Sequence, residues 1–502
     1  MRPTSPGPAS VAGRARSRSG IPSPSGAPDG EGAFSRGELI GTGFSDLDRA
    51  RSLLGSRELE GLDTDALVAA LADAPDPDQA LILLVRLLER APQVAGVLQD
   101  PERTLPMVRL LGASEALGEF LIRRPDHADL LIDPDGAAAT APALGPGGLE
   151  AEPDGLRRLL LSAVGADPDA EEPVARMRGK EAAAALRVAY RRQLTALALR
   201  DLGDPDPQLA QPRVSAWLSD LAGAAIEAAL AASRADAVEQ HGEDALAVSL
   251  AVIGMGKCGA RELNYISDVD VIFVHASGLD DGHRAAMIAA GLAAGISRYV
   301  TAAAPEPGLW EVDANLRPEG KDGALSRTVD SHAEYYRRWA HTWEFQALLK
   351  ARPIAGPQDL GRQYVETIWP LVWTSSEREG FVASVQGMRR RVLDNIAHQD
   401  RDREIKLGSG GLRDVEFTVQ LLQLVHGKAE ESVRVRNTQD AIRALEHRCY
   451  ISRRDAQSLA GAYRFLRLLE HRIQLVHLRR THLMPEKPRA RWVLARASRG
   501  PG

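Results

Sequence analysis

The chain has 502 residues, of which 44% are hydrophobic and 26% charged, an ordinary balance for a soluble globular protein of about two to four domains. Its formal net charge of −6 argues against a general nucleic-acid binder. The two cysteines, Cys258 and Cys449, lie far apart, which argues against a disulfide scaffold and favours a reducing cytoplasm. No uninterrupted apolar run reaches the length of about 18 residues that a membrane span requires, so no membrane segment is expected.

The composition changes along the chain and suggests four regions. Residues 1–36 are rich in Pro, Ser, Gly and Arg and lack hydrophobic periodicity, which predicts a disordered tail. Residues 37–240 follow the helical period and predict a helical subdomain, interrupted by a long loop at 134–155. Residues 241–360 contain the strand-like segments and are predicted to form the catalytic core, and residues 361–502 return to helical patterns.

The most informative stretch is residues 250–275, where an apolar run enters a glycine turn and two aspartates open a second apolar run. Asp268 and Asp270 are separated by one residue, so in a strand both side chains leave the backbone on the same side. Two carboxylates at the mouth of an apolar face repel each other unless a cation neutralises them. Mg²⁺ prefers oxygen ligands and shares its shell with substrate phosphates. We therefore predict a Mg²⁺ site for phosphoryl or nucleotidyl transfer, with both aspartates as catalytic metal ligands.

Two other interpretations of the glycines fail on spacing. A dinucleotide-binding fold needs a full crossover helix before the next parallel strand, whereas only residues 260–267 separate the last glycine from the acids. A P-loop would need glycine where Ala251 stands and Ser or Thr where Cys258 stands. The short connection favours an antiparallel or mixed pair of strands. Glycine turn, short connection and paired acids together resemble the polymerase-β-like nucleotidyltransferase superfamily, although Lys257 replaces its usual small residue. The expected fold is α+β, with a mixed or antiparallel sheet embedded between largely helical regions.

A third acid is predicted from the alternation of residues 309–316. Apolar side chains alternate there with polar ones, so a half-buried strand is expected with Asp313 on its polar face, as a third catalytic metal ligand. Arg317 follows at the end of this strand, where its guanidinium could hold a phosphate, and Glu319 is expected to orient it.

Three later segments carry further predictions. Ser331 and Glu334 form a capping box that predicts a helix start, followed by a stripe of aromatic residues expected mainly in the core (Tyr335, Tyr336, Trp339 and Trp343). Lys350 and Arg352 at the end of that helix are either phosphate contacts or ordinary surface cations. Residues 457–482 predict a long amphipathic helix with its basic residues on a solvated face (Arg464, Arg467, Arg472, Arg479 and Arg480).

A second functional element is the glycine loop at residues 406–411, which leads into a helix ending at His426. Free amides at a helix N-terminus bind anions, and Lys406 and Arg413 flank the loop, so a phosphate site is expected here. A tight glycine turn without a ligand is the alternative.

Five motifs in order resemble the bacterial glutamine synthetase adenylyltransferase/adenylyl-removing enzyme family over about residues 80–495. They are Gly-Met-Gly-Lys-x-Gly-x-x-Glu-Leu-Asn-x-x-Ser-Asp-x-Asp (254–270), Leu-Arg-Pro-Glu-Gly (316–320), Tyr-Tyr-x-x-Trp-x-x-Thr-Trp-Glu (335–344), Lys-Ala-Arg-Pro-Ile-Ala-Gly (350–356) and Lys-Leu-Gly-x-Gly-Gly-Leu-Arg-Asp-Val-Glu-Phe (406–417). Cys258, and the run Val-Asp-Ala-Asn-Leu-Arg at 312–317, depart from the family pattern without touching the proposed metal ligands.

The resemblance implies a place for this chain within a tandem enzyme. In that family, an N-terminal nucleotidyltransferase domain removes AMP from a tyrosine of glutamine synthetase by phosphorolysis, giving ADP, and a C-terminal one attaches AMP from ATP. This chain resembles the adenylyl-removing half, as a fragment or as a truncated gene product. The implied partners are glutamine synthetase, phosphate with ADP or ATP, and a PII-type signal protein, with neither nucleic acid nor membrane.

The expected chemistry places nucleotide phosphates at the glycine turn, on Gly254, Gly256, Lys257 and Ser267. The other phosphate is expected on Arg317, with Arg413 or Lys406 as further contacts. Three alternatives stay open: the adenylylating activity, another nucleotidyltransferase of the superfamily, or a non-catalytic module that docks glutamine synthetase or a PII-type protein.

Overall fold

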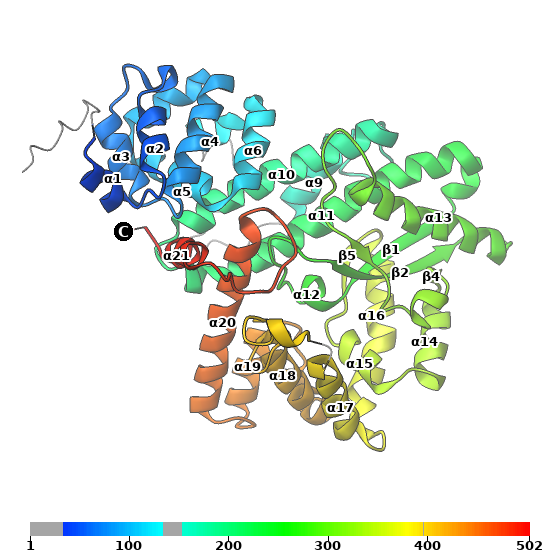
Figure 1. The fold of residues 1–502 in the computed structure, drawn as a ribbon. Coiled ribbons are helices and arrows are strands. Elements are labelled where there is room, and N and C mark those ends of the chain that lie inside the picture. The colour runs from blue at the N-terminus through cyan, green and yellow to red at the C-terminus, as the bar shows by residue number, and fades with distance from the viewer. Residues whose placement is uncertain (1–33, 134–152, 395, 502) are drawn as a thin grey trace, which may run out of the picture.

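The computed structural model describes residues 34–133, 153–394 and 396–501, and in these ranges helices surround one small mixed sheet (Figure 1). The predicted α+β class is therefore confirmed. The predicted tail and the predicted loop at 134–155 fall almost wholly outside the described residues. The predicted region boundaries stay predictions.

The sheet contains five strands in the order β3-β2-β1-β5, with β4 also paired to β2. The strands are β1 (Val248–Gly254), β2 (Val269–Ser277), β3 (Val312–Asp313), β4 (Ser326–Arg327) and β5 (Arg352–Ala355). β1 runs antiparallel to β2 and β5, whereas β3 and β4 run parallel to β2. The short connection after the glycine turn thus joins an antiparallel pair, one of the two arrangements (antiparallel or mixed) that its length favoured.

The sheet separates two hydrophobic cores because its side chains alternate between faces. Val269, Val271 and Phe273 of β2 face a large core that includes the N-terminal helices. Ile272 and Val274 face a smaller core formed with the helices that follow residue 328. Asp270 shares the parity of this second set, so its carboxylate emerges on the side of the smaller core, as the alternation predicted.

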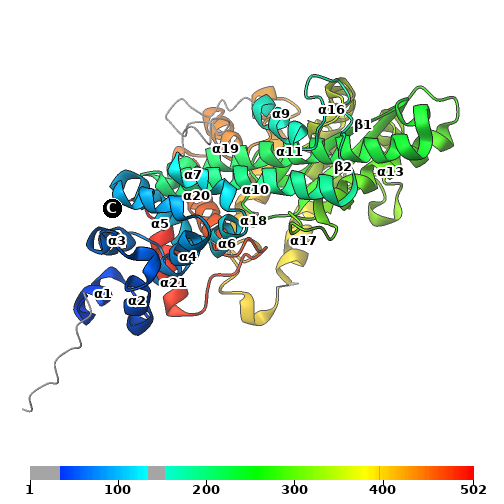
Figure 2. The same cartoon turned by 90° about the horizontal axis from the view of Figure 1, so that it is seen from above.

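The large core is built mainly by the helices that precede the sheet and by α13, as Figures 1 and 2 show. These helices are α1 (Arg36–Thr42), α2 (Leu47–Leu54), α3 (Thr64–Leu71), α4 (Pro77–Arg90), α5 (Pro101–Ala113), α6 (Glu115–Arg123), α7 (Asp129–Ile132), α9 (Pro153–Ala163), α10 (Gly179–Gly203), α11 (Pro207–His241) and α13 (Gly282–Thr301). Residues 207–245, which include α11, are by length and composition apolar enough to cross a membrane, a feature that the sequence prediction missed. However, 94% of the most apolar window is buried within the molecule, as in a core helix, and its buried alanines allow α10 and α13 to approach closely.

The smaller core lies under the helices that follow the sheet (Figure 1). They are α14 (Val329–Arg338), α15 (Thr342–Leu348), α16 (Gln358–Trp373), α17 (Phe381–Asp394) and α18 (Leu412–His426). The predicted capping box at Ser331 is wrong, because Thr328 caps α14 by accepting a hydrogen bond from the Ser331 amide. The aromatic stripe is also divided: Tyr336 is buried, whereas Trp339 ends the helix and is 71% exposed.

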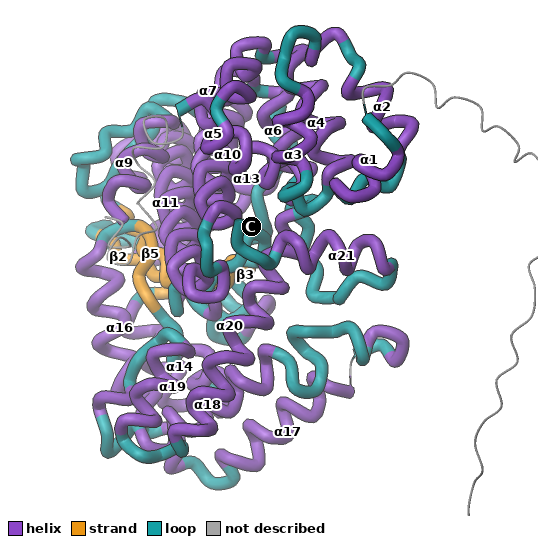
Figure 3. Tube along the Cα trace, turned by 90° about the vertical axis from the view of Figure 1, so that its left-hand side faces the viewer, coloured by secondary structure: helices purple, strands orange, loops and turns teal. Residues whose placement is uncertain are grey.

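The C-terminal helices pack against the N-terminal helices. They are α19 (Thr438–His447), α20 (Arg453–Leu475) and α21 (Pro488–Ala497), and α21 lies beside α5 (Figure 1). Figure 3 shows the strands as one small group among the helices. The prediction that the basic residues of this segment are solvated is wrong for Arg467 and Arg472, which are fully buried. Arg467 pairs with Glu470, and Arg472 donates to the carboxylate of Asp201 on α10, so each buried charge has a partner.

The predicted strand at residues 309–316 is much shorter than its alternation suggested. Only Val312–Asp313 pairs with β2. The chain turns immediately afterwards, because the Asp313 carboxylate accepts a hydrogen bond from the amide of Asn315, an Asx turn that ends the strand.

Candidate functional site

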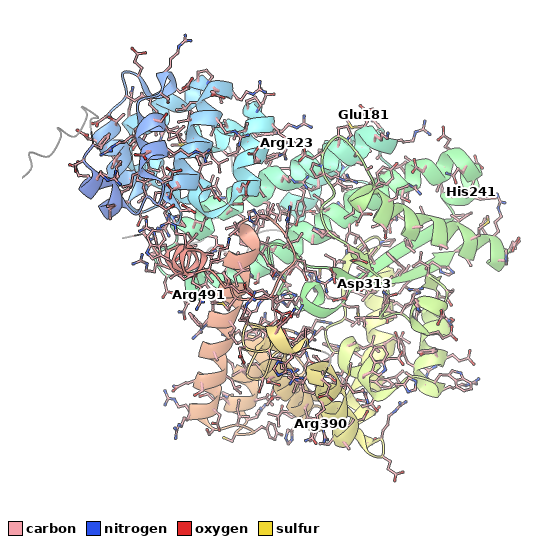
Figure 4. All side chains as sticks on the ribbon, in the orientation of Figure 1. Arg123, Glu181, His241, Asp313, Arg390 and Arg491 are labelled. Carbon is pink, nitrogen blue, oxygen red and sulfur yellow. The ribbon has the colours of Figure 1, made fainter. Side chains whose placement is uncertain are left out.

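A cleft of about 580 Å³ lies beside the sheet and collects most of the residues that the sequence singled out. Eight of the ten predicted site residues line it: Gly256, Lys257, Ser267, Asp268, Asp270, Asp313, Lys406 and Arg413. Its walls come from the glycine turn, from β2 and β3, and from α15, α17 and α18. Figure 4 shows Asp313 near the middle of the molecule, where the sheet meets the C-terminal helices.

The acidic wall is positioned by strand pairing. Asp270 of β2 is in register with Asp313 of the parallel strand β3, and Asp268 precedes β2 by one residue. The backbone oxygen of Asp270 also accepts a hydrogen bond from the Met255 amide, 2.8 Å away, which ties the glycine turn to the start of β2. Three carboxylates from two strand segments therefore face one cleft.

Burial and the neighbouring carboxylates disfavour the ionised form of Asp270. Burial raises the pKa of Asp270 to about 6, and the charges of Asp313 and Asp268 act in the same direction. Lys406 and Arg413 oppose this shift from the other wall. An all-oxygen donor set whose members repel one another fits a hard divalent cation such as Mg²⁺.

The glycine turn approaches these carboxylates closely. It continues into the one-turn helix α12 (Gly256–Gly259), and Gly256 has a φ of 48°. A Cβ atom at Gly256 would lie 2.5 Å from Oδ2 of Asp270, so a glycine is required for both the backbone conformation and the space.

The three acids share the cleft, but their side chains do not form a ready ligand set. Among the described residues, no group of three or more His, Cys, Asp or Glu side chains has the arrangement of a metal site. Oδ2 of Asp268 pairs with Nη1 of Arg480 at 2.5 Å, and Oδ1 of Asp313 accepts the Asn315 amide at 2.8 Å. Asp268 can therefore contribute to cation binding only by sharing or releasing its arginine.

Arg480 has a contact that sequence reasoning missed. It is exposed, as predicted, but it follows α20 instead of lying on it, and it lines the cleft, where it pairs with Asp268. No local signal distinguished Arg480 from its neighbour Arg479, which is also exposed.

The basic wall comes from residues flanking the predicted glycine loop. Lys406 and Arg413 both line the cleft, and Arg413 lies 3.6 Å from the buried carboxylate of Glu416. The charges of Arg413, Lys350, Lys257 and Lys406 lower the pKa of Glu416 to about 2, overcoming the opposite effect of burial. This wall therefore carries two cations, Lys406 and Arg413, and one buried carboxylate, that of Glu416.

The amides of the glycine loop are used within the protein. The Gly410 amide donates to Asp414, and the amides of Lys406 and Leu407 donate to Glu404. The Leu412 amide at the start of α18 donates to the Ile405 oxygen. These four amides therefore already have acceptors, whereas the side chains of Lys406 and Arg413 line the cleft; the anion site at the loop backbone stays a prediction.

Lys257 has a partner that the sequence did not indicate. Its Nζ donates to both carboxylate oxygens of Glu470 on α20, at 2.7 and 2.9 Å. Burial lowers the pKa of Lys257 well below its ordinary value, and the nearby charge of Arg467 adds to this effect. The lysine forms part of the cleft floor while its ammonium group connects the glycine turn to α20.

Two of the ten predicted site residues lie outside the cleft lining. Gly254 ends β1 and packs against Ile354 of the neighbouring strand region. Arg317 donates to the backbone oxygens of Ala314, Gly323 and Lys321 and so holds its own loop. The role expected of Glu319 is also wrong, since it pairs with Arg327 instead of Arg317.

Of the two cations that the sequence left undecided, Lys350 lines the cleft but pairs with buried Glu262 at 2.7 Å. Arg352 donates to the backbone oxygens of Cys258 and Gly259 and lies outside the cleft lining.

The remaining wall suits a planar, partly apolar ligand. Trp343, Leu316 and Phe417 line it, together with Gln346 and Gln420, whose side-chain amides are hydrogen-bonded to each other at 2.8 Å. Trp343 belongs to the aromatic stripe that was expected mainly in the core, but it lines the cleft and is available to stack on a planar ring.

Comparisons with known proteins indicate the family of this chain. Residues 105–367 match the model of the glutamate–ammonia ligase adenylyltransferase family, and residues 386–499 match that of GlnD PII-uridylyltransferase. Two relatives, each described as a bifunctional glutamine synthetase adenylyltransferase/adenylyl-removing enzyme, come from Leifsonia xyli and Streptomyces avermitilis. They are 50% and 48% identical to this chain over 92% and 90% of its length.

A third relative with the same description, from Corynebacterium glutamicum, is 44% identical over 89% of this chain. The aligned regions cover 45%, 43% and 43% of these three relatives, so the chain spans less than half the length of the curated relatives it matches.

Proposed function

Since the chain belongs to the glutamate–ammonia ligase adenylyltransferase family, we propose that its cleft performs Mg²⁺-dependent nucleotidyl transfer on glutamine synthetase. The favoured direction is phosphorolytic removal of AMP from an adenylylated tyrosine, giving ADP. The observation that carries the proposal is the opposition, across one cleft, of three carboxylates and the cations Lys406 and Arg413.

In this proposal, Asp268, Asp270 and Asp313 hold Mg²⁺, which when bound supplies Lewis-acid stabilisation of the charge on the phosphate oxygens. An oxygen of inorganic phosphate forms a bond to the adenylyl phosphorus, and the bond from that phosphorus to the tyrosyl oxygen breaks. The proton of hydrogen phosphate passes to the tyrosine. Because tyrosine has a pKa near 10, its oxygen is a reasonable leaving group.

The chain's own residues serve chiefly to position two anions that repel each other. Lys406 and Arg413 form the cationic wall on which the incoming phosphate is held, and Arg413 offers a planar guanidinium for two-point contact. The glycine turn at Gly256 lets the adenylyl phosphate approach the acids closely. Trp343 provides a face for the adenine. Such positioning and electrostatics account for most of the rate in phosphoryl-type transfers.

The proposal includes partners and location. The match of residues 386–499 to a PII-uridylyltransferase model supports a PII-type signal protein as regulator. The free thiols of Cys258 and Cys449 fit a reducing compartment, and we place the protein in the cytoplasm.

The deciding experiment incubates the chain with adenylylated glutamine synthetase, inorganic phosphate and Mg²⁺, and measures ADP. Asp270→Asn should lower the rate by at least about 100-fold, because a charged ligand of the proposed Mg²⁺ is removed. The exposed Asp280→Asn is the matched control and should retain full activity.

Two other outcomes point to the alternatives. Release of pyrophosphate from ATP in the presence of unmodified glutamine synthetase, without ADP formation in the first assay, would assign the adenylylating direction. Tight binding of glutamine synthetase with neither reaction would identify a non-catalytic docking module and refute the proposal.

A further inference from the structure

A second cavity, of about 940 Å³, lies behind the glycine turn, between the start of α11 and the start of α19. We call it the arginine pocket, because its lining includes seven arginines and three aspartates. The charged lining residues are Arg213, Arg261, Arg352, Arg434, Arg436, Arg443, Arg464, Asp204, Asp206 and Asp440.

The three aspartates already have partners. Asp204 lies 3.5 Å from Arg213, and Asp440 pairs with Arg443 one helical turn further along α19. Asp206 caps α11 by accepting the amide of Leu209. The positive charge in the rest of the pocket is therefore not balanced by its own acids.

Three arginines account for the unbalanced positive charge of the pocket. Arg436 has no carboxylate at ion-pair distance in the described part of the chain, and the same holds for Arg464. Arg352 reaches only Asp220, at 4.0 Å, and that carboxylate is already paired with Arg261.

The environment of Arg436 is unusual for a cation. Its guanidinium lies over the Trp369 ring, 4.2 Å from the centroid, and its Nε donates to the Ala351 oxygen at 2.7 Å. Burial lowers the pKa of Arg436 to about 10, and the charge of Arg352 acts in the same direction. Two arginines held close together and half-buried without an acid between them favour an anion from outside.

We propose that the arginine pocket binds a small phosphate-bearing anion through Arg352, Arg436 and Arg464. Planar guanidinium groups bind phosphate oxygens in pairs, and stacking on Trp369 holds one of them in a fixed orientation. The site is separate from the catalytic cleft, because the two linings share no residue.

The pocket is nevertheless connected to the cleft through a single turn of helix. Arg352 donates to the backbone oxygens of Cys258 and Gly259, at the end of α12, and the other end of α12, Gly256 and Lys257, lines the cleft. An anion that binds Arg352 therefore competes with the hydrogen bonds that Arg352 donates to the end of α12, which follows the glycine turn. This effect on turnover rests on the proposed function, whereas the binding site itself does not.

The test uses the fluorescence of Trp369, which lies against Arg436, to report binding in the arginine pocket. Tripolyphosphate is titrated into the full chain while tryptophan fluorescence and heat are recorded, with inorganic phosphate and ADP in parallel. We expect a saturable fluorescence change that is lost in Trp369→Phe although the heat of binding remains. The strongest ligand among the three probes distinguishes free phosphate from a nucleotide.

Arg464→Gln is expected to weaken this binding about tenfold, the value of one charge-assisted contact. The exposed Arg454→Gln, on the same helix, removes the same charge and should bind as the unmodified chain does. The cleft variant Arg413→Gln should also retain the Trp369 signal.

Three results would overturn the proposal: absence of a saturable Trp369 signal, a signal unchanged in Arg464→Gln, or one abolished by Arg413→Gln. The binding measurement does not require turnover, so it stays interpretable if the ADP assay fails. If binding is confirmed but tripolyphosphate changes the ADP rate of the unmodified chain and of Arg464→Gln equally, only the link to the cleft is refuted.

Discussion

At the scale of single residues, the ion pair between Arg480 and Asp268 competes directly with a metal ion. Arg480 is 53% exposed, so its pairing with Asp268 is worth about 1 kcal/mol at most. Arg480→Gln should therefore tighten Mg²⁺ binding up to about fivefold, measured by calorimetry. Arg479→Gln, an adjacent exposed arginine, is the charge-matched control. Equal Mg²⁺ affinity in both variants would show that Asp268 does not bind the ion.

A second residue-scale prediction concerns pH and the buried imidazole of His332. Burial lowers the pKa of His332 to about 3, and the ring lies between Tyr336 and Tyr364. Below pH 6.5 this histidine takes up a proton in the unfolded chain but not in the folded chain. Its titration therefore leaves the free energy of unfolding unchanged above pH 6.5 and lowers it by about 1.4 kcal/mol per pH unit between pH 6.5 and 3.

His332→Phe keeps a ring in this position and removes the titration. Denaturant unfolding between pH 6.5 and 4.5 should show a shallower pH slope, by about 1.4 kcal/mol per unit. The exposed His283→Phe should leave the slope unchanged. An unchanged slope in His332→Phe would mean that this histidine is protonated in the folded state.

At the scale of an element, the α12 turn is the part of the fold on which the acids depend most directly. Gly256→Ala is expected to cost about 1–2 kcal/mol in backbone strain and to displace the Asp270 carboxylate, lowering the ADP-forming rate by tenfold or more. Gly61→Ala is a close control, because Gly61 also has a positive φ but open space around it. If both variants lose only stability, the contact with Asp270 has no catalytic role.

At the scale of the whole molecule, α20 is attached to the N-terminal helices by a buried charge pair. Arg472 on α20 is fully buried and donates to Asp201 on α10, which also accepts the hydroxyl of Tyr265 at 2.7 Å. Asp201→Ala leaves the arginine charge unpaired and should lower the free energy of unfolding by about 3–5 kcal/mol.

Urea denaturation of Asp201→Ala, Arg472→Met and the double variant tests this coupling. The double variant should recover much of the stability, because it buries no unpaired charge. A double variant as unstable as the sum of the two single ones would contradict the prediction. Far from this pair, the exposed ion pair of Arg362 with Asp359 is a control expected to contribute under about 1 kcal/mol.

Features that depend on short spacings could be predicted from the amino-acid order. The glycine turn and the Asp-x-Asp pattern predicted a mixed or antiparallel strand pair with both acids at its mouth, and the β1–β2 pair is antiparallel. Alternation along β2 predicted the face of Asp270. These predictions succeed because strand geometry fixes the direction of a side chain from its position alone. The resemblance of five ordered motifs led to the same family as the match over residues 105–367.

Which charged side chains form pairs depends on how distant elements pack together. Arg480 and Asp268 are 212 positions apart, and Lys257 and Glu470 are 213, so no local pattern indicates either pair. The same limit explains the wrong assignment of Arg467 and Arg472 to solvent, since a buried cation is tolerated only when a distant element supplies its acid. Helical period shows where apolar side chains face, but the partner of a buried charge depends on the packing of helices from both ends of the chain.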